Sequence, residues 1–345
     1  MKVQELRQLL ADADRKLMEK AFVESYKQFP KAKKEEIDFM IQEILKGEDV
    51  KKTEKDALPD FQALEGEITE FIENAYAQNY LVPNRSVPKS KRSKWRFLVK
   101  DYIKKLEKVP LESEYYDTAV KLLTDIYKLM CDSCNTYYFS SDDPFRSIGW
   151  SQPDLYALVA IKTFACGYSR EKIAAMILLA ATGGISREDL PVMQEAVLIR
   201  ELKTADVKYM AIEEAKSFVA KCGEQLQKEK KYSHTEFYLR ENINNLCDLI
   251  LLLEISLSEP EEGLSYYFSK CQEKDKEIVL YKALWLVPWA DGDDKLWLDI
   301  YRYGLKKKIQ PRDSLKKEYQ KRLESYETKR RNDTASMGSD QKRVF

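Results

Sequence analysis

The stretch LYALVAIKTFACGYSREKIAAMILLAA, residues 155–181, decides the fold, because it is apolar at almost every position. A helix with one apolar stripe lies on a surface, whereas a helix that is apolar on most sides is buried among other helices. Lys162 and Arg170 interrupt the stretch, and a membrane-spanning helix needs about 20 consecutive apolar residues. The stretch therefore predicts buried helices inside a helical protein rather than a membrane span.

Capping residues indicate where these helices start and end. Ser151 predicts the start of a first helix, which Gly167 ends. Ser169 predicts the start of a second helix, which the glycines at 183 and 184 end. Ser186 predicts the start of a third. Three buried helices joined by short turns are typical of the middle of a helical array.

The composition favours helix throughout the chain. Only 11 of the 345 residues are glycine, and 34% are charged, as expected of helices packed on one side and solvated on the other. The predicted fold class is all-α: a multi-helix array of packed αα-hairpins, with a superhelical repeat of the tetratricopeptide or HEAT type left open. The predicted parts are an N-terminal αα-hairpin over residues 1–49, an acidic helix, a basic helix and a following helix over 58–139, a central and C-terminal helical array over 150–331, and a disordered tail over 332–345.

Two segments resemble known helical motifs. Residues 167–174 followed by 184–190 are similar to a DNA-binding helix-turn-helix, but the second helix would begin with acids where DNA would be met. Residues 296–313 resemble the second helix and exit turn of a pentatricopeptide repeat, and no second copy follows at a fixed period. The first segment is therefore predicted to be core packing. The second resemblance implies paired helices and does not imply RNA binding.

Residue types that carry catalysis or bind metals are sparse. One C-x-x-C pair, Cys131 and Cys134, lies at the end of a predicted helix, where the helix dipole disfavours a thiolate. His234 is the only histidine, and a zinc site needs about four ligands. The acids at 291, 293 and 294 precede a predicted helix and suit a helix cap. The sequence therefore predicts no catalytic residue, no metal site and no cofactor, and it leaves a redox or metal role of the cysteine pair open.

Charge is segregated between two neighbouring segments. Residues 56–84 contain six acids and no base, whereas residues 85–108 contain ten bases and two acids. A basic stripe on an anchored helix is able to bind phosphates or an acidic protein surface. The alternatives are that the stripe is only solvated or that it neutralises the acidic helix. The predicted partner-binding residues are Lys89, Lys91, Arg92, Lys94, Arg96, Lys100 and Lys104.

These features predict a binding protein rather than an enzyme. The main hypothesis is a non-enzymatic helical interaction protein, an adaptor or regulator, that binds a protein partner through a basic or concave helical face. The alternatives are a nucleic-acid-binding protein that uses residues 85–108 and an all-α enzyme with an unrecognised carboxylate site. Because no signal peptide, lipidation signal or spanning segment is recognisable, a cytoplasmic protein without membrane contact is expected. The oligomeric state stays open.

Overall fold

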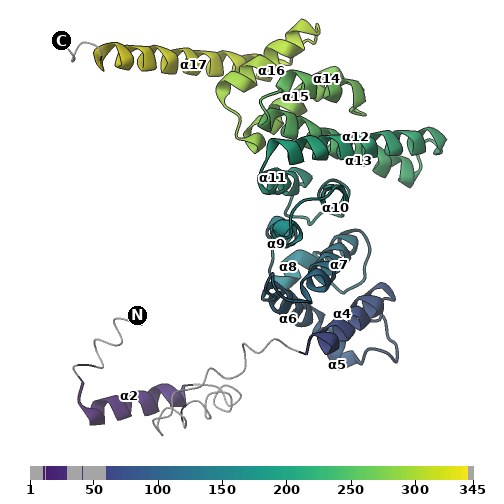
Figure 1. The fold of residues 1–345 in the computed structure, drawn as a ribbon, viewed down its shortest axis with the longest axis vertical. Helices are drawn as coiled ribbons and strands as arrows, with labels where there is room; N and C mark the ends of the chain where they lie inside the picture. The colour runs from purple at the N-terminus through teal and green to yellow at the C-terminus, as the bar shows by residue number, and fades with distance from the viewer. Residues whose placement is uncertain (1–10, 12, 29–40, 42–59, 341–345) are drawn as a thin grey trace. The chain divides into compact units, whose positions relative to one another are not determined.

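Helices are the only regular elements in the part of the chain that the structure describes, residues 11, 13–28, 41 and 60–340 (Figure 1). The structure is a computed structural model, and it confirms the predicted all-α class. The chain divides into two compact units, residues 1–58 and 59–345. The candidate sites described below all lie in the second unit.

The first unit contains α2 (Arg15–Lys27). Asp14 caps this helix, because its carboxylate accepts hydrogen bonds from the backbone N–H groups of Lys16 and Leu17, at 2.7 and 3.0 Å. Apolar periodicity predicts one helix from residue 3 to residue 29, but the backbone leaves the helical conformation at Asp14, with ψ of 159°. The second helix of the predicted hairpin, residues 37–45, lies outside the described residues except for Ile41.

The second unit begins with α4 (Phe61–Tyr76), α5 (Lys89–Arg92), α6 (Trp95–Glu107), α7 (Tyr116–Asn135) and α8 (Pro144–Ile148). α4 and α6 both pack on α7, and α8 packs on α6 and α7. The first residue of α6, Trp95, stacks on Phe139 with 4.1 Å between the ring centroids. This stacking fixes the start of α6 against the core. The short α8 lies between the predicted parts 58–139 and 150–331, and Asp143 caps it.

The stretch that decides the fold forms α9 (Gln152–Ala165), α10 (Arg170–Ala181) and α11 (Pro191–Glu201). Ser151 and Ser169 cap the first two helices, as predicted, since their hydroxyls accept from backbone N–H groups at 3.2 and 3.3 Å. The predicted helix start at Ser186 is wrong, because residues 186–190 are not helical. The Ser186 hydroxyl donates to the carboxylate of Asp143 at 2.8 Å instead of capping a helix.

A buried polar network holds the turn between α10 and α11. The Nε2 of Gln152 donates to the Gly184 carbonyl at 2.9 Å, and its Oε1 accepts from the Ser186 N–H at 2.8 Å. Gly184 lies so close to α7 that a Cβ at this position would be 2.1 Å from the carbonyl oxygen of Cys131. Only a glycine therefore fits between this turn and α7.

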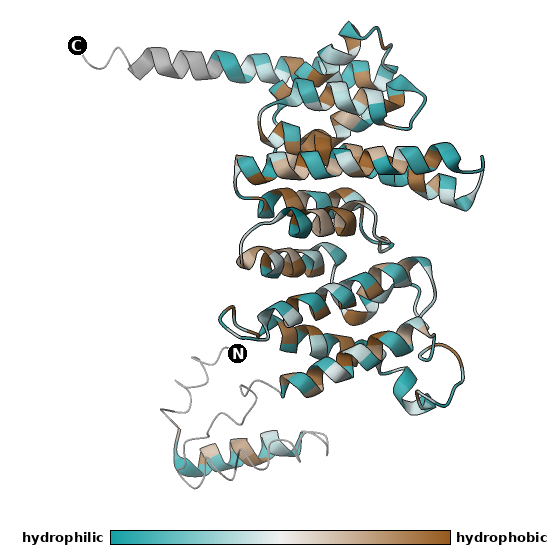
Figure 2. Cartoon of the chain, turned by 45° about the vertical axis from the view of Figure 1, so that its right-hand side comes forward, coloured by the Kyte–Doolittle hydropathy of each residue, from teal (hydrophilic) through white to brown (hydrophobic). Residues whose placement is uncertain are grey.

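The unit continues with α12 (Ala205–Lys228), α13 (His234–Ser256), α14 (Pro260–Lys270), α15 (Lys276–Leu286), the 3₁₀ helix η1 (Val287–Ala290), α16 (Asp294–Lys306) and α17 (Asp313–Asp340). α13 is an inner helix: it packs on α11, α12, α14 and α15, and its side chains from 249 to 253 are all buried. Apolar residues, brown in Figure 2, lie along the helix faces that neighbouring helices cover. The hydrophobic core of this unit is therefore formed by contacts between successive helices.

Two close approaches between helices depend on glycine. Gly304 of α16 faces Leu280 of α15, and a Cβ at Gly304 would lie 2.5 Å from the nearest carbon of that leucine side chain. Gly263 of α14 approaches Glu254 of α13 in the same way, at 2.8 Å. In both places the missing side chain lets the two helices come closer than larger residues allow.

Three further predictions from the sequence can be compared with the structure. Asp293 caps α16 by accepting from the Leu296 N–H at 2.8 Å, which confirms the predicted cap for this one acid. Asp294 is the first residue of α16, and Asp291 ends η1 instead. α17 stays helical past Arg331, where the disordered tail was predicted to begin, and residues 341–345 lie outside the described part. None of the described helices combines the length and the apolar character that crossing a membrane requires.

Candidate binding surface

The predicted basic residues lie on α5, on α6 and in the turn between them. The opposite side of α6 is buried, which holds the helix in place. The hydroxyl of Tyr102 also donates to Glu67 at 3.0 Å and so joins α6 to α4. The bases are therefore presented on a fixed scaffold. The buried residues of α6 are Trp95, Val99, Tyr102, Ile103 and Leu106.

The structure divides the predicted residues into two groups. Arg92 and Lys100 are half-buried and contact other parts of the protein, whereas the others are exposed. The stripe is also broken, because α5 ends at Arg92 and α6 starts only at Trp95. Arg92 therefore does not continue the line of bases along α6. The exposed group consists of Lys89, Lys91, Lys94, Arg96 and Lys104.

Arg92 holds the loop that precedes α5. Its Nε donates to the Val87 carbonyl at 3.0 Å, and its Nη2 donates to the Asn84 carbonyl at 3.1 Å. The side chain of Asn84 in turn donates to the Val82 carbonyl at 2.7 Å and accepts from the Val87 N–H at 2.7 Å. The guanidinium is therefore part of the loop structure and is not free to meet a partner.

Replacing Arg92 with alanine is expected to lower the free energy of unfolding by about 2 kcal/mol, because two loop carbonyls lose a charged donor. The same replacement at the exposed Lys89 is expected to change it by less than about 0.5 kcal/mol. Urea unfolding followed by circular dichroism measures both. Equal midpoints for the two variants would contradict the structural role of Arg92.

Lys100 lies against the end of α8. Its Nζ is 3.1 Å from the position that a Cβ on Gly149 would take, and Gly149 is the C-cap of α8. The C-terminal end of a helix carries partial negative charge, which a nearby ammonium stabilises. Lys100 therefore joins α6 to α8.

Lys91 and Lys94 face the acidic helix. Together with Glu67 and Glu70 of α4 they line a cavity of about 320 Å³. None of the ion pairs among residues 60–340 joins these bases to these acids, so the charges face one another without direct contact. The alternative that the bases offset the acidic helix thus fits these two lysines.

The outer side of α6 combines bases with an exposed aromatic ring. Phe97 is 58% exposed, and the guanidinium of Arg96 lies 5.1 Å from its ring centroid. Lys105 is paired with Asp101 at 2.7 Å, whereas neither Arg96 nor Lys104 has an ion pair among the described residues. We define the basic surface as Lys89, Lys91, Lys94, Arg96 and Lys104 together with Phe97.

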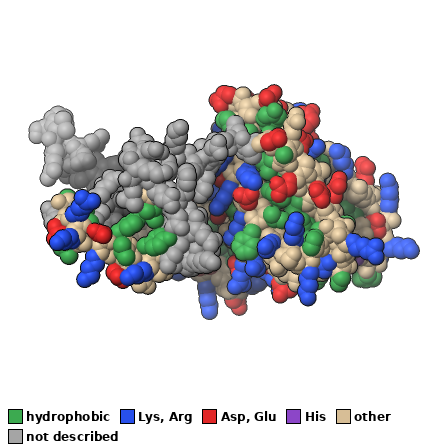
Figure 3. Space-filling model, turned by 90° about the horizontal axis from the view of Figure 1, so that it is seen from below, with side chains coloured by type: hydrophobic (Ala, Val, Ile, Leu, Met, Phe, Trp, Pro, Cys, Tyr) green, Lys and Arg blue, Asp and Glu red, His purple; other side chains and the backbone are tan. Residues whose placement is uncertain are grey.

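Basic and acidic side chains are mixed on the face shown in Figure 3, where blue and red atoms lie side by side with green apolar atoms between them. The whole chain contains 58 basic and 58 acidic residues. The basic surface is therefore a local feature, and its field extends over one Debye length, about 8 Å at physiological ionic strength. Such a surface suits a partner with a matching local cluster of acids.

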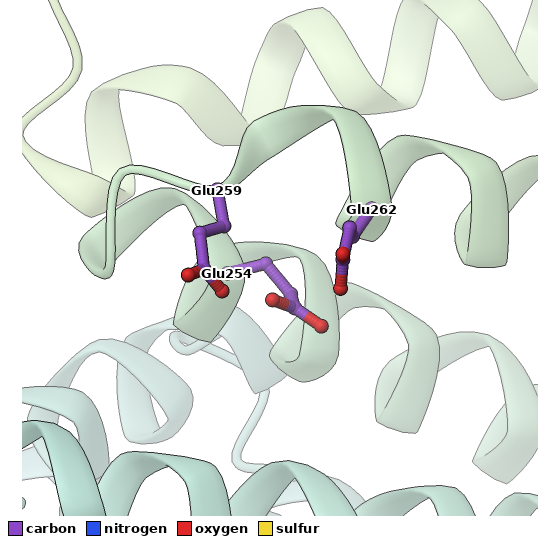
Figure 4. A group of neighbouring side chains, drawn as sticks. All are labelled: Glu254, Glu259 and Glu262. Carbon is purple, nitrogen blue, oxygen red and sulfur yellow. The ribbon is translucent and has the colours of Figure 1, made fainter.

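Three glutamates converge where α13 meets α14 (Figure 4). One carboxylate oxygen from each of Glu254, Glu259 and Glu262 lies within 4.8 Å of the others. Lys216 of α12 donates to the buried Glu254 at 3.2 Å, and the hydroxyl of Tyr209 donates to Glu259 at 2.7 Å. A cation that prefers carboxylate ligands, such as Ca²⁺, would have to displace Lys216. The cluster therefore joins α12, α13 and α14, and we assign no ligand to it.

Cys131 and Cys134 lie in the last turns of α7, as predicted, and both thiols are free. Burial raises the pKa of the Cys131 thiol above its ordinary value and raises the pKa of Cys134 to about 12. Cys134 also donates to the Met130 carbonyl at 3.4 Å. Because redox and metal-binding cysteines act as accessible thiolates, this environment does not favour either role.

Sequence reasoning missed Phe97 and the aromatic residues around η1. Phe97 falls on the polar side of α6. An apolar residue that does not fit the helical period of the buried residues is the sequence signal that could have identified it as exposed. Trp285 and Trp289 are four residues apart and lie with 5.9 Å between ring centroids. Their spacing places them on one side of a helix, but the sequence does not show that this side stays exposed.

Comparisons of the chain with protein-family models, with curated proteins and with solved structures found no match.

Proposed function

We propose that the protein is a non-enzymatic helical interaction protein that binds an acidic surface of a partner protein through its basic surface. The strongest support for this proposal is the combination of side chains on the outer side of α6. There Arg96 and Lys104 make no ion pair with described acids, and they lie on the same helix as the exposed ring of Phe97. Arginine and aromatic side chains contribute most of the energy in many protein interfaces. An acidic partner would pair with the cations and cover the ring.

A protein partner fits this surface better than a long nucleic-acid backbone. Phosphates that followed α5 and α6 would also approach Glu67 and Glu70, which line one cavity with Lys91 and Lys94, and like charges repel. In contrast to a regular phosphate backbone, the surface of a partner protein is able to carry acids opposite the basic side chains alone and none opposite the glutamates. Phe97 makes nucleic acid the second candidate, since exposed aromatic rings among basic side chains stack on unpaired nucleobases.

The test is a charge reversal at Lys89, Arg96 and Lys104, each replaced by glutamate in one full-length variant. Proteins that bind the natural chain in a pull-down are identified by mass spectrometry, and the strongest direct binder is then purified and titrated. The reversal is expected to weaken its binding about 10- to 100-fold, because three favourable charge contacts become unfavourable. Circular dichroism is expected to stay unchanged, since all three side chains are exposed.

The matched control reverses three exposed lysines elsewhere, Lys121, Lys128 and Lys274, and is expected to keep binding. If both triple variants bind equally well, the basic surface is not the docking site. If instead the natural chain binds single-stranded RNA or duplex DNA at about 50 mM salt and the first reversal abolishes this, the nucleic-acid alternative replaces the proposal.

A further inference from the structure

A short 3₁₀ helix, η1, separates two hollows on the surface of the second unit. Val287 of η1 is buried, which fixes the segment, while the side chain of Trp289 is only half-buried. Pro288 and Trp289 line both hollows. Trp285, the residue one helical turn earlier, is 41% exposed. The hollows therefore share an aromatic ridge and form one continuous surface.

The first hollow is a groove of about 650 Å³ between α11, the start of α12 and η1. Its floor includes the buried Val197 and the partly exposed Met193. Three bases stand on its rim and one acid, Asp291, is present. An apolar floor with a basic rim suits a ligand that carries both apolar and acidic groups. The rim bases are Arg200, Lys203 and Lys208.

Two of the three rim bases have no acid partner in the described part of the chain. Lys203 is paired with Glu201 at 3.3 Å and donates to the Arg200 carbonyl at 2.8 Å. Within residues 60–340, no ion pair or side-chain hydrogen bond engages the guanidinium of Arg200 or the ammonium of Lys208. Both cations are thus available to acids that enter the groove.

The second hollow, of about 420 Å³, is lined by four aromatic residues of α15, η1 and α16, by apolar residues between them, and by Glu318 and Arg322 of α17. Tyr281 is 43% exposed, and the Arg322 guanidinium lies 4.9 Å from the ring centroid of Trp297. Arg322 is already bonded to Asp294 at 2.6 Å. This hollow therefore offers aromatic contact area, while the charge that attracts acids lies in the first hollow.

We propose that the two hollows and the ridge between them form a docking surface for one segment of a partner protein that carries acidic and bulky apolar side chains. The apolar side chains of the segment lie in the hollows on either side of Trp289, and its acids pair with Arg200 and Lys208. Trp, Tyr and Arg at one place are the residue types on which tightly bound segments depend. A neutral or basic segment would bury these cations without a partner, which is unfavourable. This docking surface is separate from the basic surface of α5 and α6.

The test uses a phage library that displays random peptides of about 12 residues. The library is selected on the full-length natural chain, and the enriched peptides are synthesised with a fluorescent label and titrated by anisotropy. Peptides that combine Asp or Glu with aromatic or aliphatic residues are expected to be enriched. Trp289→Ala and the double variant Arg200→Glu/Lys208→Glu are each expected to weaken their binding at least about ten-fold. The double variant changes the exposed Arg200 and the half-buried Lys208 and leaves the aromatic side chains in place, so it keeps the test valid if Trp289→Ala affects folding.

The control variant Lys89→Glu/Lys104→Glu is expected to bind these peptides as the natural chain does, which separates this proposal from the one above. The proposal is overturned if no peptide is enriched, if the enriched peptides are basic or lack acids, or if their binding survives both groove variants. It is also overturned if the natural chain associates with itself in analytical ultracentrifugation and Trp289→Ala abolishes this, since a second copy then covers the surface.

Discussion

Replacing Gly184 with alanine is expected to lower the free energy of unfolding by about 3 kcal/mol, the upper part of the usual range for overpacking. The added Cβ would lie 2.1 Å from the carbonyl oxygen of Cys131 and 3.0 Å from the side-chain nitrogen of Asn135. A backbone oxygen inside a helix has little room to move. The turn would therefore shift and stretch the 2.9 Å hydrogen bond from Gln152 to the Gly184 carbonyl.

The matched control is Gly223→Ala in the interior of α12, where no atom of the described residues lies within 4 Å of the added Cβ. Alanine has a higher helix propensity than glycine, so this variant is expected to gain about 0.5 to 1 kcal/mol. Urea unfolding of the two variants beside the natural chain measures both changes. A Gly184→Ala midpoint equal to that of the natural chain would show that the turn does not approach α7 as closely as described.

The second large effect concerns Glu195, a fully buried residue of α11. Neither oxygen of its carboxyl group has a hydrogen-bond partner among the residues that the structure describes. Burial raises the pKa of Glu195 well above its ordinary value, and the nearby Asp248 of α13 raises it further. Tyr156 of α9 also lies close enough to interact with Glu195 electrostatically. The folded protein therefore keeps Glu195 protonated at pH values where the unfolded chain releases the proton.

Proton retention makes the protein less stable as the pH rises. Between the ordinary glutamate pKa of 4.5 and the raised pKa of the folded state, the unfolded chain binds fewer protons than the folded chain. Each pH unit in this window then removes about 1.4 kcal/mol of stability. Below the window the contribution of Glu195 to stability is fully present.

Glu195→Gln is expected to remove this dependence, because glutamine does not titrate. The difference in free energy of unfolding between the variant and the natural chain is expected to grow in favour of the variant from about pH 5 upward. Urea unfolding at several pH values measures the difference. Glu65→Gln, at an exposed position of α4, is the control and is expected to give no such trend. Parallel profiles for Glu195→Gln and the natural chain would falsify the buried, protonated state.

Helix caps that depend on near neighbours were predictable from the sequence, and caps that compete with distant residues were not. Ser151, Ser169 and Asp293 each accept from a backbone N–H three residues later, so the pattern is local. Ser186 has the same local pattern, but its hydroxyl bonds to Asp143, which is 43 residues away in the chain. A sequence pattern does not reveal a partner at that distance.

The same limit applies to charged residues. Lys162 interrupts the apolar stretch, yet it is buried: its Nζ donates to the Val109 carbonyl at 3.0 Å and lies 5.1 Å from the ring centroid of Tyr116. In the basic segment the helical period predicted which residues lie away from the core. It did not show that Arg92 and Lys100 are engaged by a loop and by the end of α8, because these contacts arise only when the helices pack.

The approach of Gly304 to Leu280 has an evolutionary consequence. A larger residue at position 304 requires a smaller one at position 280, since the two now touch. Enlarging position 304 first overpacks the contact at a cost of about 1 to 3 kcal/mol, and shrinking position 280 first leaves a void that costs about 2 to 5 kcal/mol. Either order of substitution passes through a less stable intermediate sequence. The two positions are therefore expected to change more slowly in evolution than the exposed positions around them.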